Sequence, residues 1–198
     1  MKFGGPSIVN IATVGGNICS ASSEDLLPVL LVLDAEVHVR SIHGERTIRV
    51  EDFVRGKRMT DLKPNEIVVE TSFRELEPGS ACSFEKVGMR NSLIIAFVNC
   101  AVYLKLAGEN KLCDEVRIAF NRVNGKIPQR ARQTEKIMKG KKLNAQSLSD
   151  AVATLRNELK LTSDFRASEE YRLEVACAIF KRAVGRCADR LAGEKILV

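Results

Sequence analysis

The residue types that could do chemistry gather in one short stretch near the start of the chain, residues 12–22, which read ATVGGNICSAS. The adjacent glycines Gly15 and Gly16 leave backbone N–H groups uncovered, so these groups can approach a bulky anion. Glycine also permits a positive φ where the chain must turn. The stretch therefore predicts a loop that binds phosphate, and a tight turn that needs glycine only for its geometry is the alternative. The short hydrogen-bonding side chains around the pair are Thr13, Asn17, Ser20 and Ser22.

The residues after this stretch could complete an anion site. The apolar run 26–33 predicts a short helix, in which Pro28 is tolerated in the first turn. A helix start adds the positive end of a dipole to a bound anion. Asp25 directly precedes the run, where it either accepts a ribose or ribityl hydroxyl group or complements the helix dipole. The glycine pair itself matches neither the G-x-G-x-x-G nor the G-x-x-x-x-G-K-[ST] motif.

The rest of the chain offers little for catalysis or metal binding. No two carboxylates stand out as an acid–base pair, and no serine lies in a G-x-S-x-G elbow. The six cysteines include no C-x-x-C pair, and His38 and His43 are the only histidines. We therefore predict no catalytic residue, no metal site, and thiols that are reduced and mostly buried.

Composition indicates a globular protein that lies outside the membrane. Of the 198 residues, 45% are hydrophobic and 28% are charged, which is usual for a soluble domain. The first residues lack the apolar segment of a secretory signal. The longest apolar run, 93–106, contains Asn99 and Lys105 and is too short to span a bilayer. We predict a cytoplasmic protein without a membrane partner.

The net charge of +6 lies mainly in the second part of the chain. Residues 1–80 hold 9 Lys/Arg and 12 Asp/Glu, whereas residues 81–198 hold 22 and 13. In the basic run 122–142 the only acid is Glu135, and no aromatic residue is present to stack on bases. This pattern predicts a solvated or partner-facing surface and no nucleic-acid partner. The basic residues of the run are Arg122, Lys126, Arg130, Arg132, Lys136, Lys139, Lys141 and Lys142.

Hydrophobic periodicity predicts an α+β fold in two domains, 1–78 and 79–198, separated at the Pro-Gly turn in 76–80. In the first, short helices accompany a β-hairpin over 35–42 and 46–50 and a strand over 67–73, with a polar excursion between them. In the second, strands over 81–87, 93–106 and 113–123 form a three-stranded antiparallel sheet. Helices over 129–139, 145–159 and 169–192 pack on that sheet, the last with Ser168 as N-cap.

Four segments in the same order resemble the medium, FAD-binding subunit of xanthine dehydrogenase-type molybdenum hydroxylases, and together they cover nearly the whole chain. The first is PSIVNIATVGGNICSASSEDLLPVLLVLDAEV, and the second is FEKVGMRNSLIIAFVNCAVYL. The others are GKIPQRARQTEKIMKGKKL and DFRASEEYRLEVACAIFKRAV. The order and extent of these segments predict membership of that family.

The resemblance implies a set of cofactor-binding residues. Ser20 and Asp25 match positions near the adenosine and ribityl parts of FAD. Lys86 matches a lysine close to the isoalloxazine ring, where a cation favours the anionic reduced flavin. Ile67 or Val68 matches an apolar residue that packs beside the ring. The residues matching the loop on the FAD pyrophosphate are Thr13, Val14, Gly15, Gly16 and Asn17.

The resemblance also implies an activity for the complete assembly. Electrons would pass from a [2Fe–2S] partner through FAD to NAD+ or a similar acceptor, and hydroxylation would occur on a molybdopterin subunit. The family's flavin subunits begin with a further lobe that carries a first glycine-rich loop, and this chain starts just before the second loop. We therefore expect an oxidoreductase subunit that is inactive as an isolated chain. The alternative is a non-catalytic docking module that does not bind FAD by itself.

Overall fold

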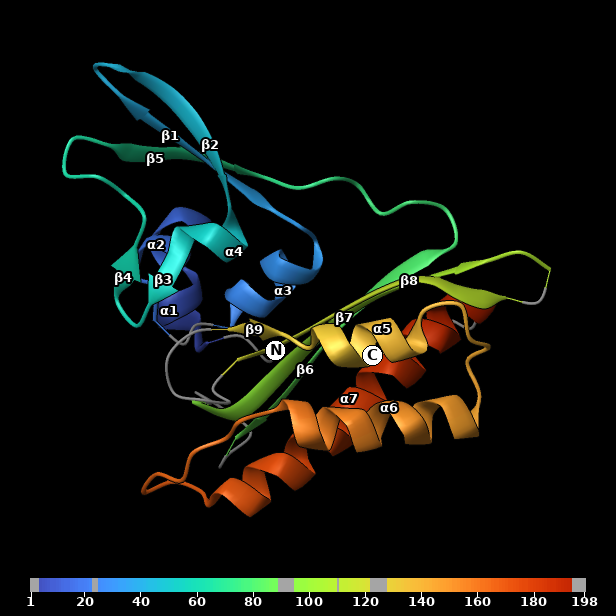
Figure 1. Cartoon of the computed structure of the whole chain (residues 1–198). Coiled ribbons are helices and arrows are strands. Elements are labelled where there is room, and N and C mark those ends of the chain that lie inside the picture. Colours follow the sequence, from blue (N-terminus) through green and yellow to red (C-terminus); the bar gives the residue numbers. More distant parts are fainter. Residues whose placement is uncertain (1–3, 23–24, 89–94, 110, 122–127, 194–198) are drawn as a thin grey trace.

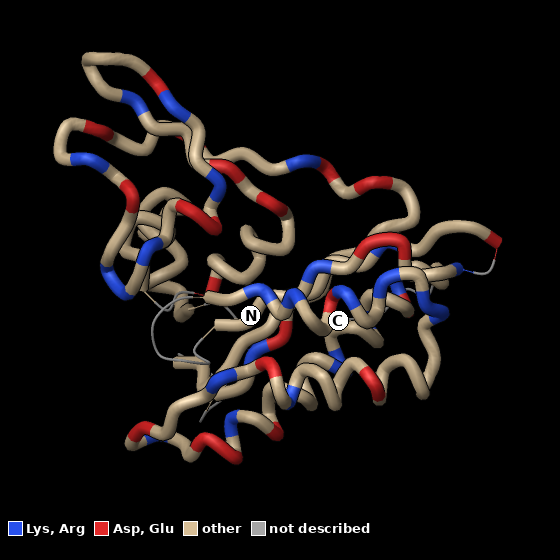
Figure 2. Tube along the Cα trace, in the orientation of Figure 1, with Lys and Arg blue, Asp and Glu red and all other residues tan. Residues whose placement is uncertain are grey.

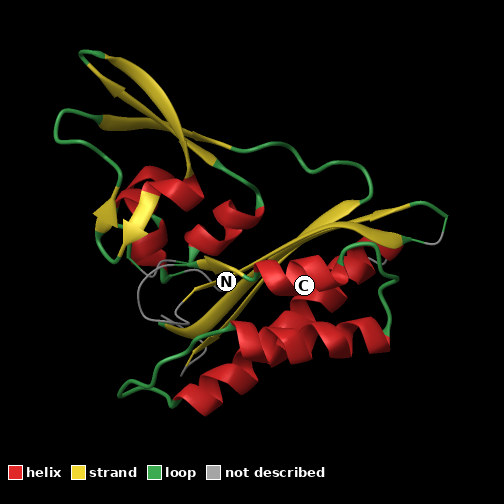
Figure 3. Ribbon diagram, viewed as in Figure 1, coloured by secondary structure: helices red, strands yellow, loops and turns green. Residues whose placement is uncertain are grey.

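The computed structural model describes residues 4–22, 25–88, 95–109, 111–121 and 128–193. It has a mixed α/β architecture with antiparallel sheets and C-terminal helices. A long antiparallel sheet lies in the middle of the molecule (Figure 1). Three helices cover one of its faces, and a first lobe, made of all the elements before this sheet, lies on the other (Figure 3). No helix in the described ranges is long and apolar enough to cross a membrane.

The first lobe is built around a β-hairpin. The predicted hairpin and the following strand are confirmed, and they form one antiparallel sheet of order β2-β1-β5. Val37 and Val39 turn inward and are buried, as the alternation predicts. The elements of the lobe are α1 (Pro6–Val9), α2 (Val14–Cys19), α3 (Leu26–Val32), β1 (Glu36–Ser41), β2 (Gly44–Arg49), α4 (Val50–Phe53), β3 (Val54–Gly56), β4 (Met59–Thr60) and β5 (Ile67–Ser72).

The predicted polar excursion before β5 contains a small hairpin, β3 and β4, that the sequence pattern did not indicate. Arg46 of β2 binds the loop that follows β4. Its guanidinium donates to Asp61 at 2.8 Å and forms a bidentate pair of hydrogen bonds with Glu66, both at 2.8 Å. These hydrogen bonds from Arg46 lower the pKa of Glu66 to about 2. The segment is ordered by these charge-assisted contacts because it has few apolar residues to bury.

The central sheet has one strand more than we predicted. Its order is β6-β7-β8-β9, with β6 (Ser80–Gly88), β7 (Ala96–Ala107), β8 (Leu112–Asn121) and β9 (Gln129–Arg130). The predicted three-stranded meander is present as β6 to β8, although Leu93, Ile94 and Val123 lie outside the described residues. The sequence predicts that residues 129–130 begin a helix, but they pair with Ala119 and Phe120, so the helix begins only after them.

Three helices cover the outer face of the sheet: α5 (Arg132–Met138), α6 (Ala145–Glu158) and α7 (Glu169–Ala192). Ser168 caps α7 as predicted, because its side chain accepts the N–H of Tyr171 at 3.2 Å. The helical spacing of the apolar residues from Tyr171 to Cys187 predicts one buried stripe on α7, but Tyr171 is 48% exposed. Its neighbour Arg172 is buried instead, since its guanidinium donates to the Phe97 carbonyl at 2.7 Å.

The sheet is buried on both faces, which explains the nearly continuous apolar sequence of β7. Its outer-face residues pack with the three helices in one hydrophobic cluster. On the inner face, Ala101 and Ala119 belong to a second cluster together with Leu27 and Leu31 of α3. The small alanine side chains allow α3 to lie close to the sheet. The first lobe therefore meets the sheet mainly through this one helix.

We predict that Ala101→Leu destabilises the chain by about 1–3 kcal/mol, because the added side chain overfills the space between β7 and α3. Urea unfolding measures the change. Ala107→Leu, at the exposed end of the same strand, is the matched control and should leave the free energy of unfolding within about 0.5 kcal/mol. Equal effects of the two substitutions would contradict close packing of α3 on the sheet.

Candidate functional site

The predicted phosphate loop is a helix in the structure. Thr13 is the N-cap of α2, and its Oγ1 accepts the N–H of Gly16 at 2.9 Å. Asn17 N–H donates to the Thr13 carbonyl at 3.0 Å and closes the first turn. Neither Gly15 nor Gly16 is among the glycines with a positive φ, so the expectation of a turn is wrong. The reason is the threonine, whose side chain makes a helix start more favourable than a loop.

The glycines of α2 nevertheless leave its first turn open. A Cβ at Gly15 would meet nothing within 4 Å, whereas a Cβ at Gly16 would lie 2.9 Å from Thr13 Oγ1. The first N–H groups of a helix have no intrahelical acceptor, and Thr13 satisfies only that of Gly16. The N–H groups of Val14 and Gly15 therefore remain for another acceptor, such as an anionic oxygen.

The other predicted residues of this stretch differ in their placement. Asn17 Oδ1 is buried and has no hydrogen-bond partner in the described part of the chain. An unpaired buried oxygen of this kind is a ready acceptor for a ligand donor. Ser20 lies at the opposite end of α2 from Thr13, and its hydroxyl donates to the Asn17 carbonyl at 2.9 Å. It is thus not adjacent to the open turn.

Two residues that the sequence separates by 61 positions meet in the structure. Lys86 Nζ on β6 donates to Asp25 Oδ2 at the start of α3, and Asn99 Nδ2 on β7 donates to Asp25 Oδ1 at 2.7 Å. The side chains of Lys86 and Asp25 are only 2% and 14% exposed. We call these three residues the Asp25 cluster. It joins the first lobe to the central sheet through a nearly buried ion pair.

Of the two residues predicted to pack beside the ring, Ile67 is 64% exposed at the start of β5, whereas Val68 is half-buried. Val68 lines an apolar groove of about 530 Å³ between α3 and β5. Gly15 opens onto the same groove. The open turn of α2 and the apolar position of β5 therefore share one cavity. Its other lining residues are Val14, Leu26, Val29, Leu30, Leu33, Val69, Glu70, Thr71 and Phe73.

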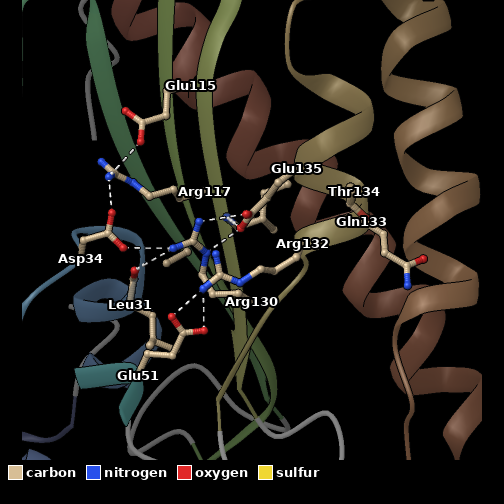
Figure 4. Close-up of polar contacts among 12 residues, drawn as sticks. Leu31, Asp34, Glu51, Glu115, Arg117, Arg130, Arg132, Gln133, Thr134 and Glu135 are labelled. Carbon is tan, nitrogen blue, oxygen red and sulfur yellow. Dashed lines mark hydrogen bonds and ion pairs between the residues drawn. The ribbon is translucent and has the colours of Figure 1, made fainter. Parts of the chain in front are cut away.

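A second group of charges holds the other end of α3 (Figure 4). Asp34, just after the helix, accepts from Arg117 at 2.5 Å, from Arg130 at 3.1 Å and from Arg49 at 3.1 Å. Arg130 also donates from Nε to Glu135 at 2.6 Å. We call these five residues the Asp34 cluster. A carboxylate therefore accepts hydrogen bonds from the sheet at each end of α3: Asp25 at its start and Asp34 just after it. These contacts fix the position of α3 on the sheet at both ends.

Neighbouring charges extend the Asp34 cluster. Arg132 donates to the Glu51 carboxylate of α4 at 2.6 and 2.7 Å, and these hydrogen bonds raise the pKa of the arginine. The guanidinium of Arg117 also lies 3.9 Å from the centre of the Tyr103 ring. Figure 2 shows acidic and basic residues interleaved where the lobe meets the sheet. The basic residues at this joint are therefore paired within the chain; Arg122 and Lys126 lie outside the described residues.

Sequence reasoning found Asp25 and Lys86 but missed Asn99, which lies inside an apolar strand. Its residue type alone could have indicated a role, because an asparagine in a buried strand needs a polar partner. Asp34, Arg117 and Arg130 were also missed as a group, since their spacing along the chain indicates no contact. Only the tertiary structure brings the members of each cluster into contact with one another.

Comparison with known proteins identifies the two parts of the chain. The model of the FAD binding domain in molybdopterin dehydrogenase matches residues 1–73, and that of the CO dehydrogenase flavoprotein C-terminal domain matches residues 83–187. A xanthine dehydrogenase FAD-binding subunit of Escherichia coli O157:H7 is 30% identical over 98% of this chain and 66% of that protein. The glyceraldehyde dehydrogenase medium chain of Sulfolobus acidocaldarius is 30% identical over 91% of this chain and 63% of that protein.

Solved structures show the same fold. Reconstituted CO dehydrogenase from Oligotropha carboxidovorans contains a chain with a TM-score of 0.86 and 26% identity, covering 94% of this chain and 64% of that one. CO dehydrogenase from Hydrogenophaga pseudoflava gives a TM-score of 0.88 at 25% identity, with 96% and 65% covered. The chain thus has the fold of chains found in these CO dehydrogenases.

The chain belongs to the medium, FAD-binding subunits of the molybdenum hydroxylase family, as its sequence segments predicted. It spans about two thirds of the length of the relatives that it matches.

We predict that Lys86→Met destabilises the chain by about 3 kcal/mol, because it leaves the Asp25 carboxylate largely buried without its cation. Adding Asp25→Asn should restore part of this loss, since the remaining side chain is then neutral. Urea unfolding of the single and double variants measures both effects. Lys139→Met, an exposed lysine, is the control. A Lys86→Met chain as stable as the control would show that the ion pair does not hold the lobe to the sheet.

Proposed function

We propose that this chain supplies one wall of an FAD site in a molybdenum hydroxylase. The observation that carries the proposal is the match of residues 1–73 to the FAD binding domain, in which the open first turn of α2 faces the apolar groove. The N–H groups of Val14 and Gly15 suit an anionic oxygen, and the groove suits an apolar ring. We therefore infer a cofactor with both a phosphate and an aromatic part.

The residues present fit such a cofactor. The N–H groups at the start of α2 and the unpaired Asn17 Oδ1 would bind its polar part, and Val68 would contact the apolar part. Lys86 and Asp25 would hold a fixed charge pair beside the site. When bound, FAD supplies the capacity to accept two electrons and release them to another carrier. The chain's own part is to bind and orient the cofactor and to place a cation near it.

The wider reaction follows from the family. We propose that electrons arrive from an iron–sulfur subunit and leave to NAD+ or a similar acceptor, while a molybdopterin subunit holds the substrate. The division into residues 1–78 and 79–198 belongs to the same proposal, as does a cytoplasmic location. The relatives are an FAD-binding subunit and a medium chain, which supports a partnered oxidoreductase subunit. We propose in addition that the isolated chain is inactive.

A second candidate is a docking module that does not bind FAD by itself. The observation that favours it is length, since about a third of each relative has no counterpart in these 198 residues. One wall contributes a few hydrogen bonds, whereas immobilising a flexible dinucleotide costs several kcal/mol. We therefore propose that further chain from outside these residues completes the site.

We predict that the 198-residue chain binds FAD with a Kd weaker than about 1 μM and that Gly15→Val weakens this binding at least about tenfold. The valine side chain would occupy the open space above the first turn of α2. Flavin fluorescence during a titration with FAD measures both constants.

Gly185→Ala is the matched control, because a Cβ there also meets nothing within 4 Å but lies in α7. It should bind FAD as the unchanged chain does. Binding that is insensitive to Gly15→Val would contradict the assignment of α2. Saturation below 1 μM would contradict the need for a second wall, and no binding at any concentration would favour the docking module.

A further inference from the structure

Asp25 stands at the N-cap of α3 but does not cap it. Aspartate at this position usually accepts a hydrogen bond from the first turn of its own helix. Here the side chain makes no such bond, and both of its oxygens accept from the central sheet. The helix thus forgoes a local stabilising contact. A residue that breaks a local rule in this way often serves a site.

Asn99 determines which way that carboxylate points. It is fully buried, with no exposed surface, and its Nδ2 lies 2.7 Å from Asp25 Oδ1. A carboxylate can only accept, so the amide nitrogen, and not its oxygen, must face Asp25. With Oδ1 occupied by Asn99, Oδ2 remains for Lys86. Each oxygen therefore has one donor, and the carboxylate has no freedom to rotate.

The orientation of Asn99 has a cost that supports a role beyond packing. Its own Oδ1 is buried without a hydrogen-bond partner in the described residues. A leucine of similar volume would avoid this unpaired oxygen and suit the apolar surroundings of β7. The side chain is thus poorly explained as part of the core. Its amide donor toward Asp25 is the contact that accounts for it.

We propose that Asn99 is a positioning residue that fixes the Asp25 carboxylate and, through it, the ammonium group of Lys86. Its functional meaning rests on the proposed FAD site, where Lys86 is the cation placed near the cofactor. Asn99 and Lys86 come from neighbouring strands, whereas Asp25 comes from the first lobe. The position of the Lys86 ammonium group is therefore fixed when the first lobe packs on the central sheet.

The test follows the ammonium protons of Lys86 by NMR in the full chain labelled with 15N-lysine. A lysine held in a buried ion pair exchanges these protons slowly with water. We expect Asn99→Leu to speed this exchange roughly tenfold or more, because Asp25 can then rotate away from Lys86. Asn99→Ser, which keeps a smaller donor, should give an intermediate rate and guards against a leucine variant that does not fold.

The control is Asn121→Leu, an equally buried asparagine that pairs with Asn99 across β7 and β8. It should leave the Lys86 exchange rate unchanged, whatever it does to stability. Unchanged exchange in folded Asn99→Leu, or equal acceleration in both leucine variants, would overturn the proposal. The measurement needs no flavin, so it is distinct from the FAD titration. Slow exchange that depends on Asn99 in a chain that never binds FAD would support the positioning role and contradict the proposed function.

Discussion

The packing of α3 against the inner face of the central sheet is the contact on which the rest of the structure depends. The helix is short, and its apolar side chains reach the sheet only because Ala101 and Ala119 leave room. Burial of this apolar surface is favourable, but it is non-directional and does not by itself fix the orientation of α3 on the sheet. The carboxylates at its two ends fix this orientation, since Asp25 and Asp34 each accept hydrogen bonds from donors on the strands. The apolar contacts hold α3 against the sheet, and the charged contacts at its two ends determine where along the sheet it lies.

This arrangement explains why the Asp25 cluster lies where two separately matched segments meet. The segment 1–73 contributes the open turn of α2 and the carboxylate of Asp25, whereas 83–187 contributes Lys86 and Asn99. Neither segment alone contains the charge pair. A charge that is buried in this way must be balanced by its partner, so a change in the docking of α3 also changes the Asp25–Lys86 pair. The Asp25 cluster is thus part of the joint between the two segments, whereas the apolar groove is lined by the first segment alone.

The parts of the fold that local patterns specify were predictable from the sequence. The hairpin follows from alternation around a turn, and α7 follows from Ser168 and its apolar stripe. The short strand β9 was not predictable, because two residues become a strand only through pairing with β8. The glycine pair was predicted to lie in a loop, but it lies in a helix whose N-cap is Thr13. The contact of Asp25 with Lys86 and Asn99 depends on tertiary packing, which no spacing along the chain reveals.

Native-state hydrogen exchange tests most directly whether the docking of α3 unites the two parts of the chain. If it does, the backbone amides of Leu30 and Leu31 in α3 and those of Val102 and Ile118 in the sheet open with the same free energy. Replacing Asp25 and Asp34 together by alanine should then lower the opening free energy of α3 and leave that of the sheet nearly unchanged. Amides of α3 that already exchange independently of the sheet in the unchanged chain would contradict the account.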